Sequence, residues 1–167
     1  MRLTILGALA AVSLTAALAA AAGAAPGAGV ARAELAPYTT AHTGVITNSG
    51  VVGRAQIENT PSGQAVLSVT AEGLTPGGTY AVHIHYGHCL DYLGHYQYEH
   101  PGPGTRSNEV WLDLAANAAG RAIDQVRVAA IDLDQPLSLV MHQHANPDVE
   151  TGVPGSRIAC GDLDLNG

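Results

Sequence analysis

The sequence contains no lysine and no phenylalanine, and it has only one tryptophan, Trp111. Seven arginines face 14 acidic residues, which gives a formal net charge of −7 at pH 7. Nucleic-acid binding needs clustered positive charge, so this balance excludes that class of protein. Without phenylalanine, the core must be filled by valine, leucine, isoleucine and Trp111. A chain of 167 residues is long enough for one ordinary domain with a sizeable core.

The first part of the chain has the organisation of a secretory signal peptide. Arg2 supplies a positive start, residues 3–22 are apolar and alanine-rich, and Ala31-Arg32-Ala33 offers a small-residue cleavage motif. We predict cleavage after Ala33, so that residues 1–33 are removed and residues 34–167 form the exported domain. That domain keeps five arginines against 14 acids, which gives a net charge of about −9. We expect anionic surfaces to repel it and no stable association with a membrane. The alternatives are cleavage near Ala25, beside a proline, and an uncleaved anchor, because 20 apolar residues can span a membrane.

Only two cysteines occur, Cys89 and Cys160. In an exported chain an even pair is best interpreted as a disulfide. Closing a loop of about 70 residues would stabilise the fold by roughly 4 kcal/mol in the chain-entropy model. The alternative, a cysteine metal ligand or nucleophile, has little support because neither cysteine lies in a CxxC motif.

The exported domain has the pattern of an all-β protein. Short strand-like segments recur at near-regular spacing with glycine and proline between them, which indicates a sandwich or barrel. Two irregular stretches, residues 88–108 and 143–156, interrupt this rhythm, and loops of this length in a compact domain are usually functional or disordered. The expected strands cover residues 44–48, 51–58, 64–72, 80–87, 109–116, 120–131, 137–142 and 157–165.

His83 and His85 form a His-x-His pair on one expected strand. Side chains two apart on a strand project from the same face, about 7 Å apart, so both imidazoles can converge on one metal ion. Imidazole suits copper, zinc, iron and nickel, and the pair alone does not choose among them. The alternative is two histidines on the solvated face of a sheet.

A series of motifs follows one order along the chain: Gly73-Leu-Thr-Pro-Gly77, Val82-His-Ile-His-Tyr-Gly87, Cys89, Leu93-Gly-His95, Leu139-Val-Met-His142 and Gly155-Ser-Arg-Ile-Ala-Cys-Gly161. In these motifs, over residues 50–165, the chain resembles the copper/zinc superoxide dismutase family, and the last motif is the most specific. The resemblance implies an eight-stranded Greek-key β-sandwich, a flattened barrel with two long functional loops and the metal on its outer face.

Carried over residue by residue, the resemblance implies a redox site. Its copper ligands would be His83, His85, His95 and His142, with Arg157 facing the open side of the metal and Cys89 joined to Cys160. Four imidazoles suit copper that cycles between Cu(II) and Cu(I). A fixed guanidinium attracts and orients superoxide, a small anion. One superoxide would be oxidised to O2 and a second reduced to hydrogen peroxide, with Arg157 and His95 taking part.

The family's zinc site is incomplete in this chain. His100 and Asp113 are possible zinc ligands, but residues 102–140 contain no histidine, and zinc needs about four ligands. With the short loop after His142, this absence resembles the copper-only branch of the family. In that branch an acid orients the histidine at the bridging position, and here Glu109 or Asp113 could accept the second N–H of His95. The alternative for Asp113 is a strand-edge acid in water.

The sequence therefore predicts an exported, copper-dependent superoxide dismutase, secreted or held in the periplasm or cell envelope, with zinc doubtful. The competing interpretation is a copper-binding or copper-buffering protein without significant turnover, because function depends on the site and not the fold. A third interpretation, a metal-free structural domain, leaves four histidines at family spacing unexplained. The expected partner is superoxide, and both a monomer and a homodimer are compatible with the sequence.

Overall fold

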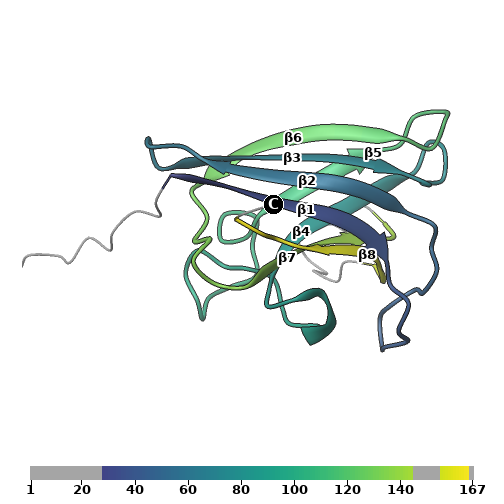
Figure 1. The fold of residues 1–167 in the computed structure, drawn as a ribbon, viewed down its shortest axis with the longest axis horizontal. Coiled ribbons are helices and arrows are strands. Elements are labelled where there is room, and N and C mark those ends of the chain that lie inside the picture. Colours follow the sequence, from purple (N-terminus) through teal and green to yellow (C-terminus); the bar gives the residue numbers. More distant parts are fainter. Residues whose placement is uncertain (1–27, 145–154, 166–167) are drawn as a thin grey trace, which may run out of the picture.

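The computed structural model describes residues 28–144 and 155–165, which form a β-barrel (Figure 1). One short 3-10 turn, η1 (Cys89–Asp91), follows the fourth strand. Within the described residues, no helix has both the length and the apolar character needed to cross a membrane. The strands are β1 (Gly29–Pro37), β2 (Val52–Asn59), β3 (Gln64–Glu72), β4 (Thr79–Tyr86), β5 (Trp111–Ala115), β6 (Ala122–Ala129), β7 (Leu137–His142) and β8 (Arg157–Asp162).

The strands form one antiparallel sheet in the order β5-β4-β7-β8-β1-β2-β3-β6, which curls into a nearly closed barrel. Non-consecutive neighbours, such as β4 with β7 and β8 with β1, are Greek-key crossovers. β1 joins the two halves of the barrel, because it pairs with β2 over seven positions and with β8 at its end. The predicted all-β, eight-stranded Greek-key class is therefore confirmed.

The first strand differs from the one expected. Residues 44–48 make only isolated bridges, at Val45 and Thr47, while β1 covers Gly29–Pro37. Ala31 and Ala33 of β1 are buried. The predicted cleavage after Ala33 falls inside this strand and would remove five of its nine residues. Part of the predicted signal peptide, residues 1–27, lies outside the described residues.

The main core lies between the two halves of the barrel and consists mostly of aliphatic side chains, with Tyr80, Tyr96 and Met141 among them. In β2 and β3 buried and more exposed positions alternate, as expected for strands with one solvated face. Trp111 is not in this core: it is only partly buried and lies opposite His83 on the neighbouring strand. The largest fully buried side chains include Ile57, Leu67, Ile84, Leu114, Ile131, Leu137, Leu139 and Met141.

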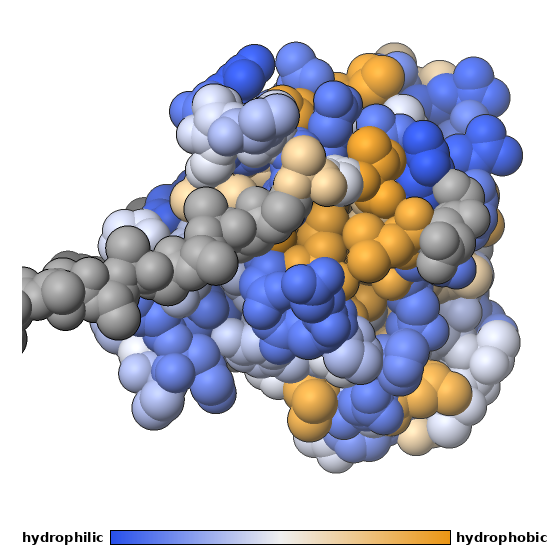
Figure 2. All heavy atoms as spheres, turned by 60° about the vertical axis from the view of Figure 1, so that its left-hand side comes forward, coloured by the Kyte–Doolittle hydropathy of each residue, from blue (hydrophilic) through white to orange (hydrophobic). Residues whose placement is uncertain are grey.

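One side of the barrel is shown in Figure 2, where apolar side chains gather at the centre of a face that is otherwise mostly hydrophilic. The large apolar residues that are exposed in the described chain are Val52, Leu90, Leu93, Ile123 and Leu165. Two of them, Val52 on β2 and Ile123 on β6, line the same surface pocket. The chemistry-bearing side chains lie elsewhere, on the outer face of β4 and β7.

Candidate metal centre

Four histidines from three segments meet on the outer face of β4 and β7. His83 and His85 alternate along β4 with Val82 and Ile84, whose side chains enter the core. The loop after β4 folds back against this strand. Its backbone forms a β-bridge between His95 and His85, and the amide of Tyr96 donates to the Ile84 carbonyl at 2.8 Å. His142 ends β7, where the pairing with β8 shifts register after Met141. Irregularities of this kind often re-aim a side chain beside an active site.

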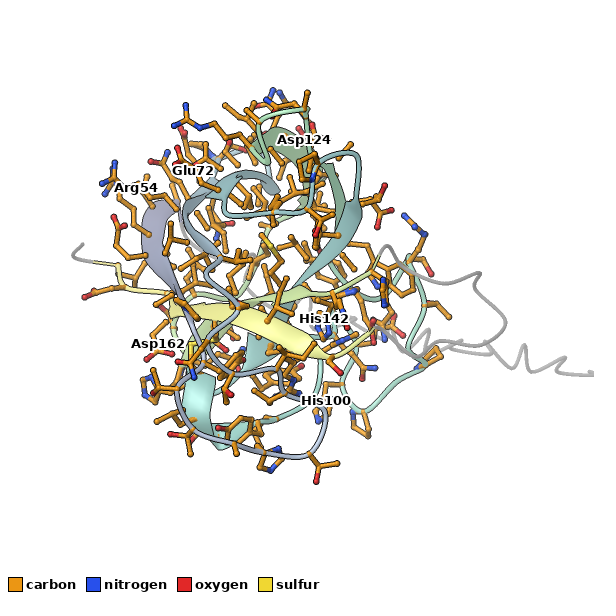
Figure 3. The ribbon with its side chains drawn as sticks, turned by 90° about the vertical axis from the view of Figure 1, so that its right-hand side faces the viewer. Arg54, Glu72, His100, Asp124, His142 and Asp162 are labelled. Atoms are coloured by element: carbon orange, nitrogen blue, oxygen red, sulfur yellow. A yellow bond between two sulfur atoms is a disulfide. The ribbon has the colours of Figure 1, made fainter. Side chains whose placement is uncertain are left out.

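The four rings lie close to one another. Ring centroids are 4.1 Å apart for His83 and His95, 4.6 Å for His85 and His95, 5.4 Å for His83 and His142, and 5.6 Å for His85 and His142. One ligand atom from each of His85, His95 and His142 lies within 4.8 Å of the other two. The structure therefore brings the rings of all four sequence-predicted copper ligands close together, while the ligand atom of His83 groups with those of His95 and Glu109. Figure 3 shows His142 at the opposite end of the β7–β8 pair from Asp162.

Backbone carbonyls fix the orientation of two of these rings. Nδ1 of His85 lies 2.9 Å from the Leu93 carbonyl oxygen, and Nδ1 of His142 lies 2.7 Å from that of Gly155. A carbonyl only accepts hydrogen bonds, so each Nδ1 carries the proton and each Nε2 carries a lone pair. The two Nε2 atoms are 3.5 Å apart. Two facing lone pairs repel each other, and a cation between them removes the repulsion, so the donor set fits a metal ion.

Burial keeps these rings in the form that binds metal. Desolvation lowers the pKa of His142 to about 4, and it lowers the pKa of His85 well below the usual 6.5, with the neighbouring His95 adding to the effect. Both imidazoles are therefore neutral near pH 7. Metal ions bind the neutral ring, so no proton has to be displaced from Nε2 of either residue.

Glu109 accepts a hydrogen bond from His95. Its Oε2 lies 2.8 Å from Nδ1 of His95, and the residue is 6% exposed. Together with His83 and His95, it forms a second group of possible ligand atoms within 4.8 Å. The indole N–H of Trp111 also donates to Oε2, at 2.9 Å, and a donor on that oxygen competes with a cation there. Glu109 is thus placed to orient His95 through its outer nitrogen.

The other two residues considered for zinc lie apart from this group. Nδ1 of His100 contacts the side-chain oxygen of Gln97 at 3.2 Å, and its ring packs against Tyr86. The Asp113 carboxylate forms an ion pair with Arg106 at 3.1 Å. Neither belongs to a group of potential metal ligands within the described part of the chain. The structure therefore does not bring His100 and Asp113 to His95.

Arg157 lies at the open side of the histidine cluster. Its guanidinium donates to the Leu93 carbonyl at 2.8 Å, the same oxygen that accepts from His85. A cavity of about 560 Å³ opens here, and its lining includes His42, Tyr92, His85, His95, His142 and Arg157. Arg157 is therefore a fixed cation at the opening of a cavity that is lined by His85, His95 and His142.

The predicted disulfide is confirmed: Cys89 is bonded to Cys160. It joins the loop that carries Leu93 and His95 to β8, three residues after Arg157. The amide of Cys89 also donates to the Asp162 carboxylate at 2.6 Å. The loop that supplies the Leu93 carbonyl is therefore anchored to β8, the strand that also carries Arg157.

Two residues near the site were not predicted to belong to it, and one of them, Trp111, was expected in the core. His42 stacks on Tyr92, with ring centroids 3.8 Å apart, and lines the cavity; nothing in the sequence near His42 signals this contact. Trp111 donates to Glu109 and packs edge-on against His83 at 5.2 Å. A signal for Trp111 existed, because residues 109 and 111 are two apart and so share one face of a strand.

No family model matches the sequence, and no curated protein matches it. Solved structures do resemble it. The clock protein EA4 is 20% identical with a TM-score of 0.63, over 83% of this chain and 95% of that one. A double mutant of a SOD-like protein from Bacillus subtilis is 18% identical with a TM-score of 0.56, over 79% and 95%. At these identities the likeness shows the fold alone. The chain therefore has a superoxide dismutase-like fold with a histidine cluster that could bind a metal ion.

Proposed function

We propose that this protein is an exported, copper-dependent superoxide dismutase that works without zinc. The observation that carries the proposal is the facing pair of Nε2 atoms on His85 and His142, held by carbonyls, with Arg157 at the mouth. His83 and His95 would complete a four-imidazole copper site. An all-imidazole donor set suits copper, and the disulfide fits an oxidising compartment outside the cytoplasm.

Bound copper would supply one-electron chemistry through its Cu(II) and Cu(I) states. The remaining tasks fall to the chain. Its net negative charge repels superoxide from most of the surface, so the fixed guanidinium of Arg157 provides a local attraction for the anion. Because Leu93 holds both Arg157 and His85, the arginine keeps a constant position relative to a copper ligand. The anion would therefore meet the metal in one orientation.

The zinc-free part of the proposal rests on what surrounds His95. A zinc ion at its outer nitrogen would need further ligands, and His100 and Asp113 are engaged elsewhere. The carboxylate of Glu109 already accepts from that nitrogen. We propose that Glu109 orients the imidazole from outside, in place of a second metal.

A second candidate is a copper-binding protein without significant turnover. It is favoured by the range of proteins that share this fold, since one solved neighbour is a clock protein. Arg157 favours the enzyme, because copper storage does not require an anion-attracting cation beside the metal. The same preparation can separate these candidates.

The test is to load the purified exported chain with copper and zinc together, then measure bound metal and the consumption of superoxide by stopped flow. We expect about one copper and no zinc per chain, with rapid consumption. His142→Ala should lose both copper and activity. The matched control is His144→Ala, an exposed histidine two residues later, which should retain both. Stoichiometric copper without consumption would establish the binding protein, and no bound copper would overturn both candidates.

A further inference from the structure

We infer that Trp111, held by Arg106, is a positioning residue that fixes the Glu109 carboxylate against His95. The inference rests on the proposed function, in which His95 is a copper ligand. It adds to that function a chain of side chains behind the ligand: Arg106 covers Trp111, Trp111 donates to Glu109, and Glu109 accepts from His95.

Two donors share one carboxylate oxygen. The indole Nε1 of Trp111 donates to Oε2 of Glu109 at 2.9 Å, and Nδ1 of His95 lies 2.8 Å from the same Oε2. The other oxygen, Oε1, has a longer contact of 3.4 Å with the side-chain amide of Gln97. Rotation of the carboxylate about its last torsion would break both short bonds. The indole therefore restricts which oxygen faces His95 and where it lies.

Tryptophan suits this position for three physical reasons. Its N–H is a donor only and carries no charge, so it can point at a carboxylate without competing for the metal site. Its large ring shields a nearly buried acid from water, which strengthens the remaining hydrogen bonds. Its ring also meets His83 edge-on at 5.2 Å, because Trp111 pairs directly with His83 across β5 and β4. One side chain thus contacts both His83 and the acid that orients His95.

Arg106 holds the outer side of the indole. Its guanidinium carbon lies 4.7 Å from the centre of the Trp111 ring, a cation–π geometry, and its NH2 group donates to Asp113 at 3.1 Å. Residues 111 and 113 lie on the same face of β5, so the arginine bridges neighbouring side chains. Asp113 is therefore connected to the site through Arg106 and Trp111.

The indole hydrogen bond should set which nitrogen of His95 carries the proton. While the carboxylate stays in place, Nδ1 keeps its hydrogen and Nε2 presents its lone pair to the cluster. Without the indole donor, the carboxylate can turn toward other donors and the ring can adopt the opposite tautomer. Removing the partner of a metal-binding histidine typically costs 10–100-fold in metal affinity. We expect the lower part of that range, because Glu109 itself remains.

The experiment uses Trp111→Phe, which keeps an aromatic ring beside His83 and removes the N–H. The matched control is Tyr98→Phe, which deletes a nearby hydrogen bond to the Ala129 carbonyl and leaves Glu109 untouched. In the metal-free protein, long-range ¹⁵N correlation spectra should show one His95 tautomer in wild type and Tyr98→Phe, and a mixture in Trp111→Phe. In the copper form, Trp111→Phe should weaken copper binding about tenfold and shift the Cu(II)/Cu(I) potential.

A double-mutant comparison tests whether Trp111 acts through Glu109. In a Glu109→Ala background, Trp111→Phe should change copper affinity by less than about twofold, since the acceptor that it positions is gone. An equal loss in both backgrounds would overturn the inference. If Trp111→Phe fails to fold, the indole N–H resonance of the only tryptophan gives a second measurement. It should move upfield in Glu109→Gln, and an unchanged shift there would also overturn the inference.

The proposed function and this inference can fail separately. A single His95 tautomer that becomes mixed in Trp111→Phe supports the positioning role even if copper-loaded wild type consumes no superoxide. Rapid consumption by wild type, with tautomer, copper affinity and potential all unchanged in Trp111→Phe, would overturn the positioning role and leave the dismutase intact.

Discussion

The two halves of the barrel bury their strands differently. In β2 and β3 one face packs into the core and the other carries side chains such as Arg54 and Glu72, which are exposed. In β4 and β7 nearly every residue is buried on both faces. Figure 3 shows Arg54 and Glu72 on one side of the barrel and His142 on the other.

The difference shows how a solvated sheet face becomes a candidate metal centre. Over β7 and β8, a second small apolar cluster of Tyr38, Val140 and Cys160 is packed by Val45, Cys89 and Tyr92 from the covering loops. The loop between β1 and β2 is tied down through the backbone of Arg157, which bonds to Gly44 and Ile46. This cover removes water from the imidazoles, and desolvation is the main cause of their lowered pKa values.

The largest expected effect comes from cutting β1, the strand that joins the two halves. A chain that begins at Glu34 loses five of the seven register pairs with β2 and the buried side chains of Ala31 and Ala33. Each lost hydrogen bond costs about 1 kcal/mol, and whole domains are stable by only about 5–15 kcal/mol. We expect this chain to be largely unfolded by circular dichroism at 25 °C, whereas a chain that begins at Ala28 should be folded.

The mass of the exported protein gives the matching observation in cells. If the strand is needed, its N-terminus should lie upstream of Gly29, which agrees with the alternative cleavage near Ala25. An exported, folded protein that begins at Glu34 would show that β1 is dispensable and that the two halves hold together without it.

The position of β1 also shows why part of the fold could not be predicted from the sequence. Residues 29–33 read Gly-Val-Ala-Arg-Ala, and the small residues at 31 and 33 suit a cleavage motif and equally suit a strand packed closely in a barrel. Local pattern cannot separate these, because the deciding contacts come from β2 and β8. By contrast, residues 64–72 and 137–142 were predicted with the bounds observed, since clear turn signals or strong strand formers mark their ends.

The next effect in size is on the disulfide that anchors the cover. Replacing Cys89 and Cys160 by serine releases a loop with a sequence separation of 71 residues. The chain-entropy model assigns about 4 kcal/mol to this constraint, so thermal unfolding should shift down by roughly 10 °C or more. Copper affinity should also fall, because Leu93 and His95 lie in the released loop.

A control for this variant is the wild-type protein under reducing conditions, which should shift in the same direction. A double serine variant with unchanged unfolding temperature would indicate that the loop contacts alone hold the cover over the histidines.

A smaller effect is expected from Arg157→Lys. Lysine keeps the charge but cannot reach the carbonyls of Leu93 and Tyr92 with a planar fork, so the cation becomes mobile. We expect the second-order rate with superoxide to fall about tenfold while the copper content stays at one per chain. Arg127→Lys, an exposed arginine on β6, is the matched control and should leave the rate unchanged. An unaltered rate in Arg157→Lys would mean that charge alone, without a fixed position, guides the anion.

The residues of the candidate site could be predicted from the sequence, but the contacts between them could not. Glu109 and Asp113 were equal candidates for contacting His95, because alternation puts both on the same face of one strand. The strand register distinguishes the two acids. Asp113 pairs with Ala81 of β4, whereas Glu109 forms a β-bridge with Gln97, which lies in the same loop as His95. Such long-range register depends on the whole sheet. For Trp111, the spacing from residue 109 signals a shared strand face, but its pairing with His83 depends on the same long-range register.

The smallest expected effect tests how completely the cover excludes water. Burial raises the pKa of Tyr38 to about 12, from an ordinary value of 10. Below pH 10 the phenol is neutral in both the folded and unfolded states, so its ionisation does not lower the free energy of unfolding. Above pH 10 the unfolded chain loses this proton and the folded chain does not, so stability falls until pH reaches about 12. At pH 11 the loss is about 1 kcal/mol.

Denaturant unfolding at pH 8 and pH 11 should therefore show a decrease in wild type that is about 1 kcal/mol larger than in Tyr38→Phe. Equal decreases in the two proteins would mean that water reaches Tyr38, and the outer face of β7 and β8 would then resemble the solvated faces of β2 and β3.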